Sequence, residues 1–299
     1  MASTTASRLL PPQTLAGLAN LELIARTAVE GFLIGLHRSP HYGFSQEFKE
    51  YRAYVEGDDP RFVDWNVYAR TERTYVRRYE GETNTRLTIV LDASASMGYR
   101  SGAITKLQYA KFLAAAFAYL ASRQHDPVGL IVFDEQVRHY RPPTSRTGSL
   151  AGLIHTIDSV EPGSGTDLIG CFRRFREHLL RRGLVVVISD LYCDPEAMSK
   201  AVQPLAYRGH DIVLFQLLDP KELKPEWREA VVLEDIETRQ TMNVSPDYLA
   251  EEYGKRMDAH LSALRSAAAR ARAEQVLIST DEPLDRALRR YLSFRRGKV

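Results

Sequence analysis

The order of hydrophobic and polar positions predicts alternating strands and helices over residues 85–299. Unbroken apolar runs are typical of strands buried on both faces, whereas apolar residues at intervals of three and four indicate amphipathic helices. The predicted strands are 87–91, 128–133, 184–189, 212–217 and 275–279, with a short edge strand at 137–140. The predicted helices are 105–123, 149–157, 167–180, 195–207, 247–272 and 283–294. Helices of this length between strands imply right-handed crossovers, so the pattern predicts an α/β fold with a doubly wound, mainly parallel sheet.

Two segments depart from this alternation. A hairpin of two short strands is predicted as an insertion near residues 230–245. Residues 15–36 carry apolar side chains at helical spacing, which predicts one amphipathic helix or two shorter ones. We therefore expect residues 1–84 to form a helical and extended segment that packs on a main domain of residues 85–299.

Composition narrows the classes of partner. The chain has 299 residues, of which 44% are hydrophobic and 26% charged, and its net charge is +2. Acidic residues are interspersed with the basic ones, so we expect no nucleic-acid partner and at most peripheral contact with a membrane. Cys171 and Cys193 are too few for a disulfide framework. The apolar stretch 21–36 is interrupted by charges and no signal-peptide pattern precedes it, so we expect a cytoplasmic protein.

The most specific chemistry follows the first predicted strand. That strand ends directly before Asp92, and Ser94 and Ser96 follow at steps of two. Open α/β sheets bind their ligands at the carboxyl ends of strands. Carboxylate and hydroxyl oxygens suit a hard cation, Mg²⁺ first, with Mn²⁺ or Ca²⁺ as alternatives. Taken alone, the Asp-x-Ser-x-Ser pattern is more often an ordinary solvated turn.

Two further segments strengthen the metal hypothesis. The loop 162–167 ends at a predicted helix start, which holds Thr166 there. The strand 184–189 ends at Asp190, which brings a second carboxylate to the same edge of the sheet. The predicted metal site consists of Asp92, Ser94, Ser96, Thr166 and Asp190.

This arrangement resembles the metal-ion-dependent adhesion site (MIDAS) of the von Willebrand factor A family, and all five ligand types match. The resemblance implies a Rossmann-type, three-layer fold. It also implies that some of these side chains hold the cation directly and others through water. One coordination position would then stay open for an acidic group of a partner.

A second distinctive string lies upstream, at residues 57–65: Gly-Asp-Asp-Pro-Arg-Phe-Val-Asp-Trp. Because this string runs into the metal-site pattern, the chain closely resembles a bacterial family known as domain of unknown function fifty-eight, from about residue 30 onward. Members of that family look like partners of MoxR-type AAA+ ATPases. The resemblance therefore implies such an ATPase, or its client protein, as the partner of this chain.

The turn that contains Asp58, Asp59 and Arg61 has two interpretations. It is either a surface that binds the partner or a structural staple that ties the amino-terminal segment to the main domain. Paired charges beside a tryptophan usually organise a fold, so we favour the staple. We also expect Phe62 and Trp65 to be covered by a neighbouring surface.

Three hypotheses about function follow. The leading one is a non-enzymatic, divalent-cation-dependent protein-interaction module, an adaptor or co-chaperone of a MoxR-type AAA+ ATPase, that binds an acidic residue of its partner. The second is a metal-dependent phosphoester hydrolase, and the third is a structural scaffold with an unused metal site. The sequence offers metal ligands without an obvious base or nucleophile beside them, which favours the first hypothesis.

Overall fold

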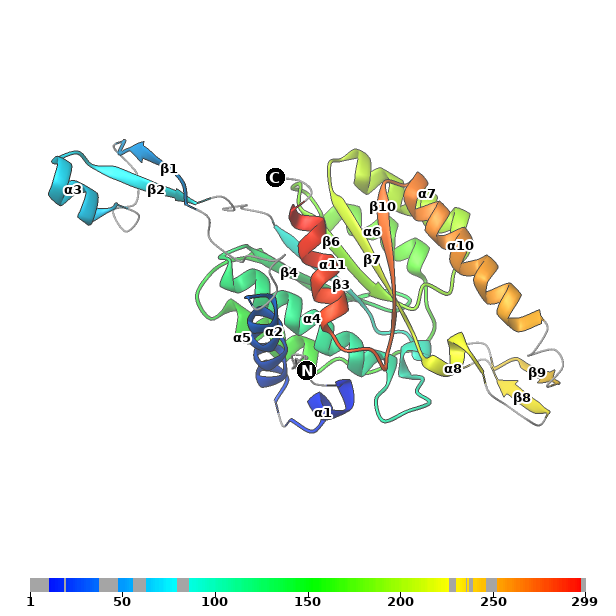
Figure 1. Ribbon diagram of the computed structural model, residues 1–299. Helices are drawn as coiled ribbons and strands as arrows, with labels where there is room; N and C mark the ends of the chain where they lie inside the picture. Colours follow the sequence, from blue (N-terminus) through cyan, green and yellow to red (C-terminus); the bar gives the residue numbers. More distant parts are fainter. Residues whose placement is uncertain are drawn as a thin grey trace.

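The computed structural model of the chain describes residues 11–18, 20–37, 48–55, 63–79, 86–225, 230–234, 236, 239–245 and 252–296 (Figure 1). The helices are α1 (Pro12–Ala16), α2 (Leu21–His37), α3 (Trp65–Thr71), α4 (Lys106–Arg123), α5 (Ser149–Asp158), α6 (Leu168–His178), α7 (Pro195–Tyr207), α8 (Pro220–Leu223), α10 (Gly254–Arg270) and α11 (Asp285–Arg296). The strands are β1 (Phe48–Ala53), β2 (Tyr75–Tyr79), β3 (Leu87–Asp92), β4 (Val128–Phe133), β5 (Val137–Thr144), β6 (Leu184–Ser189), β7 (Asp211–Leu218), β8 (Val231–Glu234), β9 (Thr241–Val244) and β10 (Ala273–Ser279).

A six-stranded sheet forms the centre of the molecule, in the order β10-β7-β6-β3-β4-β5. Neighbouring strands are parallel except for the antiparallel pair β4 and β5. The hairpin β8–β9 is a separate two-stranded ribbon. The predicted α/β fold, with its mainly parallel sheet and inserted hairpin, is confirmed. Edge strand β5 is longer than predicted because it continues through Pro142 and Pro143, which an edge strand tolerates.

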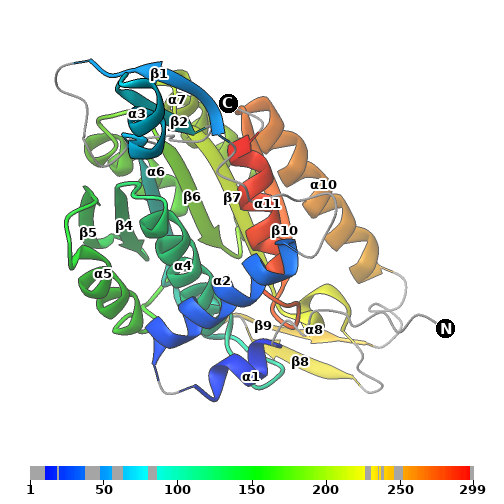
Figure 2. The same ribbon diagram turned by 60° about the vertical axis from the view of Figure 1, so that its left-hand side comes forward.

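Helices cover both faces of this sheet, so the fold has three layers (Figures 1 and 2). Helices α4, α5 and α11 pack on one face, and α6, α7 and α10 pack on the other. Side chains of β3 alternate between the two cores, with Ile89 and Leu91 in the first and Val90 in the second. This explains the unbroken apolar run of β3, because both faces of the strand are buried.

Helix α2 adds a partial fourth layer, because it packs on the outer side of α4. Its residues Ile24, Val29 and Phe32 are at most 4% exposed and belong to the same core as the sheet. Residues 112–118 of α4 are accordingly all apolar and buried, since the sheet covers one side of the helix and α2 the other. The helical part of the amino-terminal segment is therefore built into the core.

The unit made of β1, α3 and β2 stands away from the sheet (Figure 1). Asp64 caps α3 by accepting hydrogen bonds from the backbone N–H groups of Asn66 and Val67, at 3.0 and 3.2 Å. Trp65 is 61% exposed and meets the Tyr68 ring edge-on, with 6.0 Å between ring centroids. The expectation that Trp65 is covered is therefore wrong for this chain by itself.

The other residues predicted for that region are Asp58, Asp59, Arg61 and Phe62, and they lie outside the described residues. Their role as a partner surface or as a staple stays a prediction. Trp65, which follows these charges in the sequence, is exposed, so a buried tryptophan does not support the staple. Asp64 caps a helix there, a local role that the sequence interpretation did not assign to it.

The two cysteines and the helix lengths bear on the predicted environment. Cys171 and Cys193 are both free, and burial raises the pKa of each thiol to about 12, so neither is a ready thiolate at neutral pH. Within the described ranges, the helices lack the length and apolar character that crossing a bilayer requires.

Candidate metal site

The two predicted carboxylates lie where the chain connections of the sheet diverge. Strand β3 leads into α4 on one face, whereas its neighbour β6 leads into α7 on the other. Such a switch point leaves a crevice at the carboxyl ends of the two strands. Asp92 is the last residue of β3, and Asp190 directly follows β6.

Asp92 is fully buried, and hydrogen bonds hold both of its carboxylate oxygens. Oδ1 accepts from the backbone N–H of Ser94 at 2.9 Å, and Oδ2 accepts from the hydroxyl of Ser189 at 2.5 Å. Burial and, secondarily, the charge of Asp190 raise the pKa of Asp92 to about 7, although these hydrogen bonds oppose the rise. Among the described residues no cation forms an ion pair with Asp92, so its negative charge is left without a counter-charge.

The hydroxyls of Ser94 and Ser96 lie side by side. Their Oγ atoms are 3.0 Å apart, and a short 3-10 turn over Ala95–Gly98 sets this spacing. Adjacent oxygen ligands of an octahedral Mg²⁺ with bonds of about 2.1 Å lie about 3.0 Å from each other. The spacing of the two hydroxyls therefore fits neighbouring positions on one cation.

The loop that carries Thr166 is attached to the loop that carries these serines. The carbonyl of Ser164 accepts from the Ala95 N–H at 2.7 Å, and the Gly163 N–H donates to the Ala93 carbonyl at 2.6 Å. Thr166 is half-buried. The two backbone hydrogen bonds bring the loop that carries Thr166 against the loop that carries the serines.

Asp190 is also buried, but it already has a cationic partner. Its Oδ2 accepts from the ammonium of Lys106 at 2.8 Å, and the same ammonium donates to Glu222 Oε1 at 2.7 Å. Burial lowers the pKa of Lys106, but Asp190 and Glu222 together raise it above its ordinary value. The sequence analysis did not find Lys106, Glu222 or Ser189, and the one available signal was a lysine at the start of an otherwise apolar helix.

The donor set as a whole suits a hard divalent cation. Clusters of three or more His, Cys, Asp and Glu side chains able to hold a metal do not occur in the described part of the chain. The candidate site instead combines two carboxylates with hydroxyls, which is the oxygen-only chemistry that Mg²⁺ prefers. Direct hydrogen bonds join Asp92, Ser94 and Ser96, backbone contacts bring in the Thr166 loop, and Asp190 faces them across the switch point.

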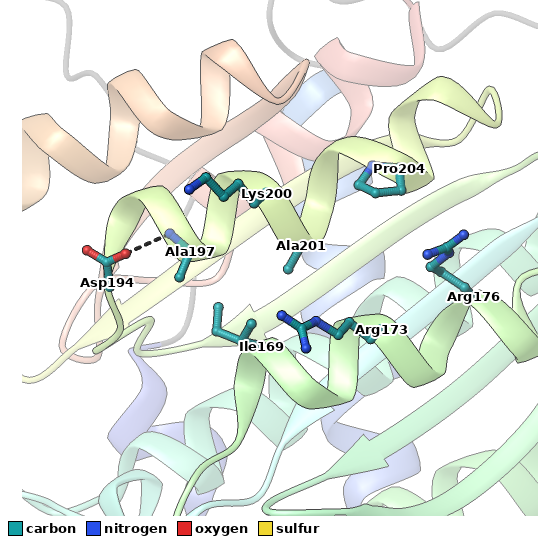
Figure 3. A pocket seen from close by; sticks show the side chains of 8 residues that line it. All are labelled: Ile169, Arg173, Arg176, Asp194, Ala197, Lys200, Ala201 and Pro204. Atoms are coloured by element: carbon teal, nitrogen blue, oxygen red, sulfur yellow. Dashed lines mark hydrogen bonds between the residues drawn. The ribbon is translucent and has the colours of Figure 1, made fainter.

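A groove of about 280 Å³ runs between α6 and α7 (Figure 3). It is lined by Ile169, Arg173, Arg176, Asp194, Ala197, Lys200, Ala201 and Pro204. Asp194 caps α7 there by accepting from the Ala197 N–H at 2.7 Å. None of the five predicted metal ligands lines this groove, so it is separate from the candidate site.

These features define an α/β protein with a six-stranded, mainly parallel sheet and a candidate cation site at its switch point. The model of the family described as "Protein of unknown function DUF58" matches residues 50–263, so the chain belongs to this family. The family resemblance inferred from the sequence is thereby confirmed. The chain is similar to "Uncharacterized protein Mb1516" of Mycobacterium bovis, with 29% identity over 255 residues, which cover 83% of this chain and 79% of the relative.

The chain is also similar to proteins whose structures have been solved. One is the conserved hypothetical protein BatB from Bacteroides thetaiotaomicron, with 17% identity, a TM-score of 0.48, and coverage of 70% of this chain and 97% of that one. Another is the SpRpn10 VWA domain, with 12% identity, a TM-score of 0.38, and coverage of 69% and 95%.

Proposed function

We propose that this chain is a non-enzymatic protein-interaction module whose binding depends on a divalent cation. The cation would be held by Asp92, Ser94, Ser96, Thr166 and Asp190. The observation that carries this proposal is a fully buried Asp92 without a counter-charge, beside two serine hydroxyls at the spacing of adjacent ligands. A bound Mg²⁺ or Mn²⁺ supplies a positive charge and an open coordination position at this crevice.

The chemistry of the donors indicates what such a site prefers to bind. Three of the five donors are neutral hydroxyls, so the donor set carries no more negative charge than the two carboxylates supply, which only just matches the charge of a divalent cation. Asp190 also shares its charge with Lys106, which leaves more of the cation's charge available. In a partly dry crevice this charge favours a carboxylate over water. The preferred ligand is therefore an Asp or Glu side chain of a partner protein.

The identity of the partner rests on the family resemblance. We propose a MoxR-type AAA+ ATPase, or its client protein, as the source of the acidic side chain. The chain would then act as an adaptor or co-chaperone of that ATPase in the cytoplasm.

A metal-dependent phosphoester hydrolase is the second candidate, and one observation favours it. A carboxyl group whose pKa is about 7, as at Asp92, is suited to general acid–base catalysis. Both oxygens of Asp92 are already engaged by Ser94 and Ser189, however, and the side chain is fully buried. The raised pKa of Lys106 keeps that amine protonated, so it is not a base. Geometry thus supports an interaction site more than a catalytic one.

Association with the MoxR-type ATPase of the same organism tests the proposal. We expect binding, measured by fluorescence titration, to weaken about tenfold or more in EDTA, the loss expected when a buried carboxylate loses its cationic partner. Thr166→Ala should weaken it in Mg²⁺, while Arg26→Ala, on an exposed part of α2, should leave it unchanged. Full affinity under chelation would contradict the metal-bridged mechanism. Cation-dependent hydrolysis of a phosphoester, lost in Asp92→Asn, would support the hydrolase.

A further inference from the structure

Lys106 is a buried lysine beside the candidate site that none of the proposed ligand roles requires. Its side chain is 1% exposed, and its ammonium lies 2.8 Å from Asp190 Oδ2 and 2.7 Å from Glu222 Oε1. The rings of Tyr99 and Tyr192 flank it, with centroids 5.9 and 5.2 Å from the ammonium nitrogen. Taking an ammonium out of water costs free energy unless carboxylates compensate it, so this charge is held in place by Asp190 and Glu222.

Helix geometry does not account for this lysine. Lys106 is the first residue of α4, where the partial positive charge of the helix dipole disfavours a cation. Thr105 already caps the helix by accepting from the Gln108 N–H at 3.0 Å. The position of Lys106 is therefore explained by its carboxylate partners and not by its helix.

The second carboxylate connects the site to the hairpin insertion. Glu222 belongs to α8, which precedes the β8–β9 hairpin, and its backbone carbonyl accepts from the Tyr253 hydroxyl at 2.6 Å on the far side of that hairpin. Its Oε2 accepts from the Asp219 N–H at 2.8 Å, and Asp219 in turn binds the backbone N–H and the hydroxyl of Ser101. Both ends of the hairpin insertion therefore contact Glu222, which pairs with the same lysine, Lys106, as Asp190 does.

We propose that Lys106 is the internal counter-cation of the metal site. Lys106 shares Asp190 with the bound divalent cation, and through Glu222 it links occupancy of the site to the base of the β8–β9 hairpin. This inference rests on the proposed function. In the absence of the divalent cation, the ammonium is the cation that compensates Asp190, and it shares its charge with Glu222. With the divalent cation present, Asp190 divides its charge between the two cations, so Lys106 lowers the affinity of the site for the divalent cation. Glu222 opposes this effect, because it attracts the ammonium of Lys106 away from Asp190.

Two substitutions of opposite expected effect test this role. Lys106→Met removes the competing charge and should raise the affinity for Mn²⁺ about tenfold, while it lowers the melting temperature in EDTA. Glu222→Gln leaves the ammonium to Asp190 alone and should lower the affinity for Mn²⁺ severalfold. Both affinities are measured by calorimetric titration of the full chain, with Asp92→Asn as the variant that should not bind. If Lys106→Met does not fold, Glu222→Gln still tests the proposal.

The outcomes separate this inference from the proposed function. If Lys106 is merely structural, Lys106→Met lowers the melting temperature while both variants keep the wild-type affinity, and the inference is overturned with the metal site intact. If the wild-type chain binds no Mn²⁺, both the inference and the proposed function fail. Amide hydrogen exchange in β8–β9 should slow on addition of Mn²⁺ to the wild-type chain and not to Glu222→Gln. Exchange unaffected by Mn²⁺ in the wild-type chain would overturn the link to the hairpin.

Discussion

Replacing Phe32 by alanine is expected to lower the free energy of unfolding by about 3–5 kcal/mol, because it leaves a cavity between α2 and the helices beneath it. Phe32 is 1% exposed and belongs to the core that also contains the sheet. The guanidinium of Arg289 in α11 lies 5.7 Å from the centre of its ring, a contact that the substitution also removes. Urea denaturation of the two proteins measures the difference.

The same helix provides the control. Leu23 is 48% exposed, so Leu23→Ala should change the free energy of unfolding by less than about 0.5 kcal/mol. If Phe32→Ala lowered the free energy of unfolding as little as Leu23→Ala, α2 would have to be an appendage that contributes little to the core. A chain that begins at Thr85 would then fold as well as the full chain, whereas we expect it to aggregate because the outer side of α4 is exposed.

In EDTA, the stability of the fold is expected to fall as the pH rises from 5 to 8, because Asp92 must ionise in a buried site. Its folded-state pKa of about 7 lies above its ordinary value of 3.8, so the folded state binds a proton more tightly than the unfolded state. The contribution is fully present below the ordinary pKa and is lost as the pH rises through about 7. Between pH 5 and 8 the loss amounts to about 3 kcal/mol.

Other groups titrate in the same range, so the informative quantity is the difference between the wild-type chain and Asp92→Asn. The asparagine side chain cannot ionise, so the free energy of unfolding of the variant should decline less between pH 5 and 8. Adding Mg²⁺ should reduce the decline in the wild-type chain, since a bound cation stabilises the ionised carboxylate. Parallel curves for the two proteins in EDTA would contradict the assignment of this pH dependence to Asp92.

Much of the fold follows from local sequence signals. Strands β3 and β6 are unbroken apolar runs because both of their faces are buried, and each run ends at the carboxylate that enters the site. The spacing of Asp92, Ser94 and Ser96 is likewise local, so the sequence was sufficient to bring these three together. Both signals depend on residues a few positions apart, which is where pattern analysis is strongest.

The features that the sequence analysis missed depend on distant partners. Lys106 pairs with residues 84 and 116 positions away, and a lysine in an apolar helix does not reveal which carboxylates it meets. The ribbon of β1 and β2 has no core-facing periodicity to detect, because it stands away from the sheet and is rich in charged residues. The exposure of Trp65 was missed for a different reason, because its burial was inferred from residue type alone.

The most direct test of the cation site is a calorimetric titration of the full chain with Mn²⁺ at pH 7.5, alongside Asp92→Asn. The substitution keeps the shape of the side chain and one acceptor oxygen for the Ser94 N–H, and the Ser189 hydroxyl can accept from the new amide group, so circular dichroism should show the fold unchanged. We predict one saturable Mn²⁺ site in the wild-type chain, displaced by Mg²⁺, and no saturable site in the variant. Equal Mn²⁺ binding by the two proteins, or none by the wild-type chain, would contradict the proposal that Asp92, Ser94 and Ser96 form a cation site.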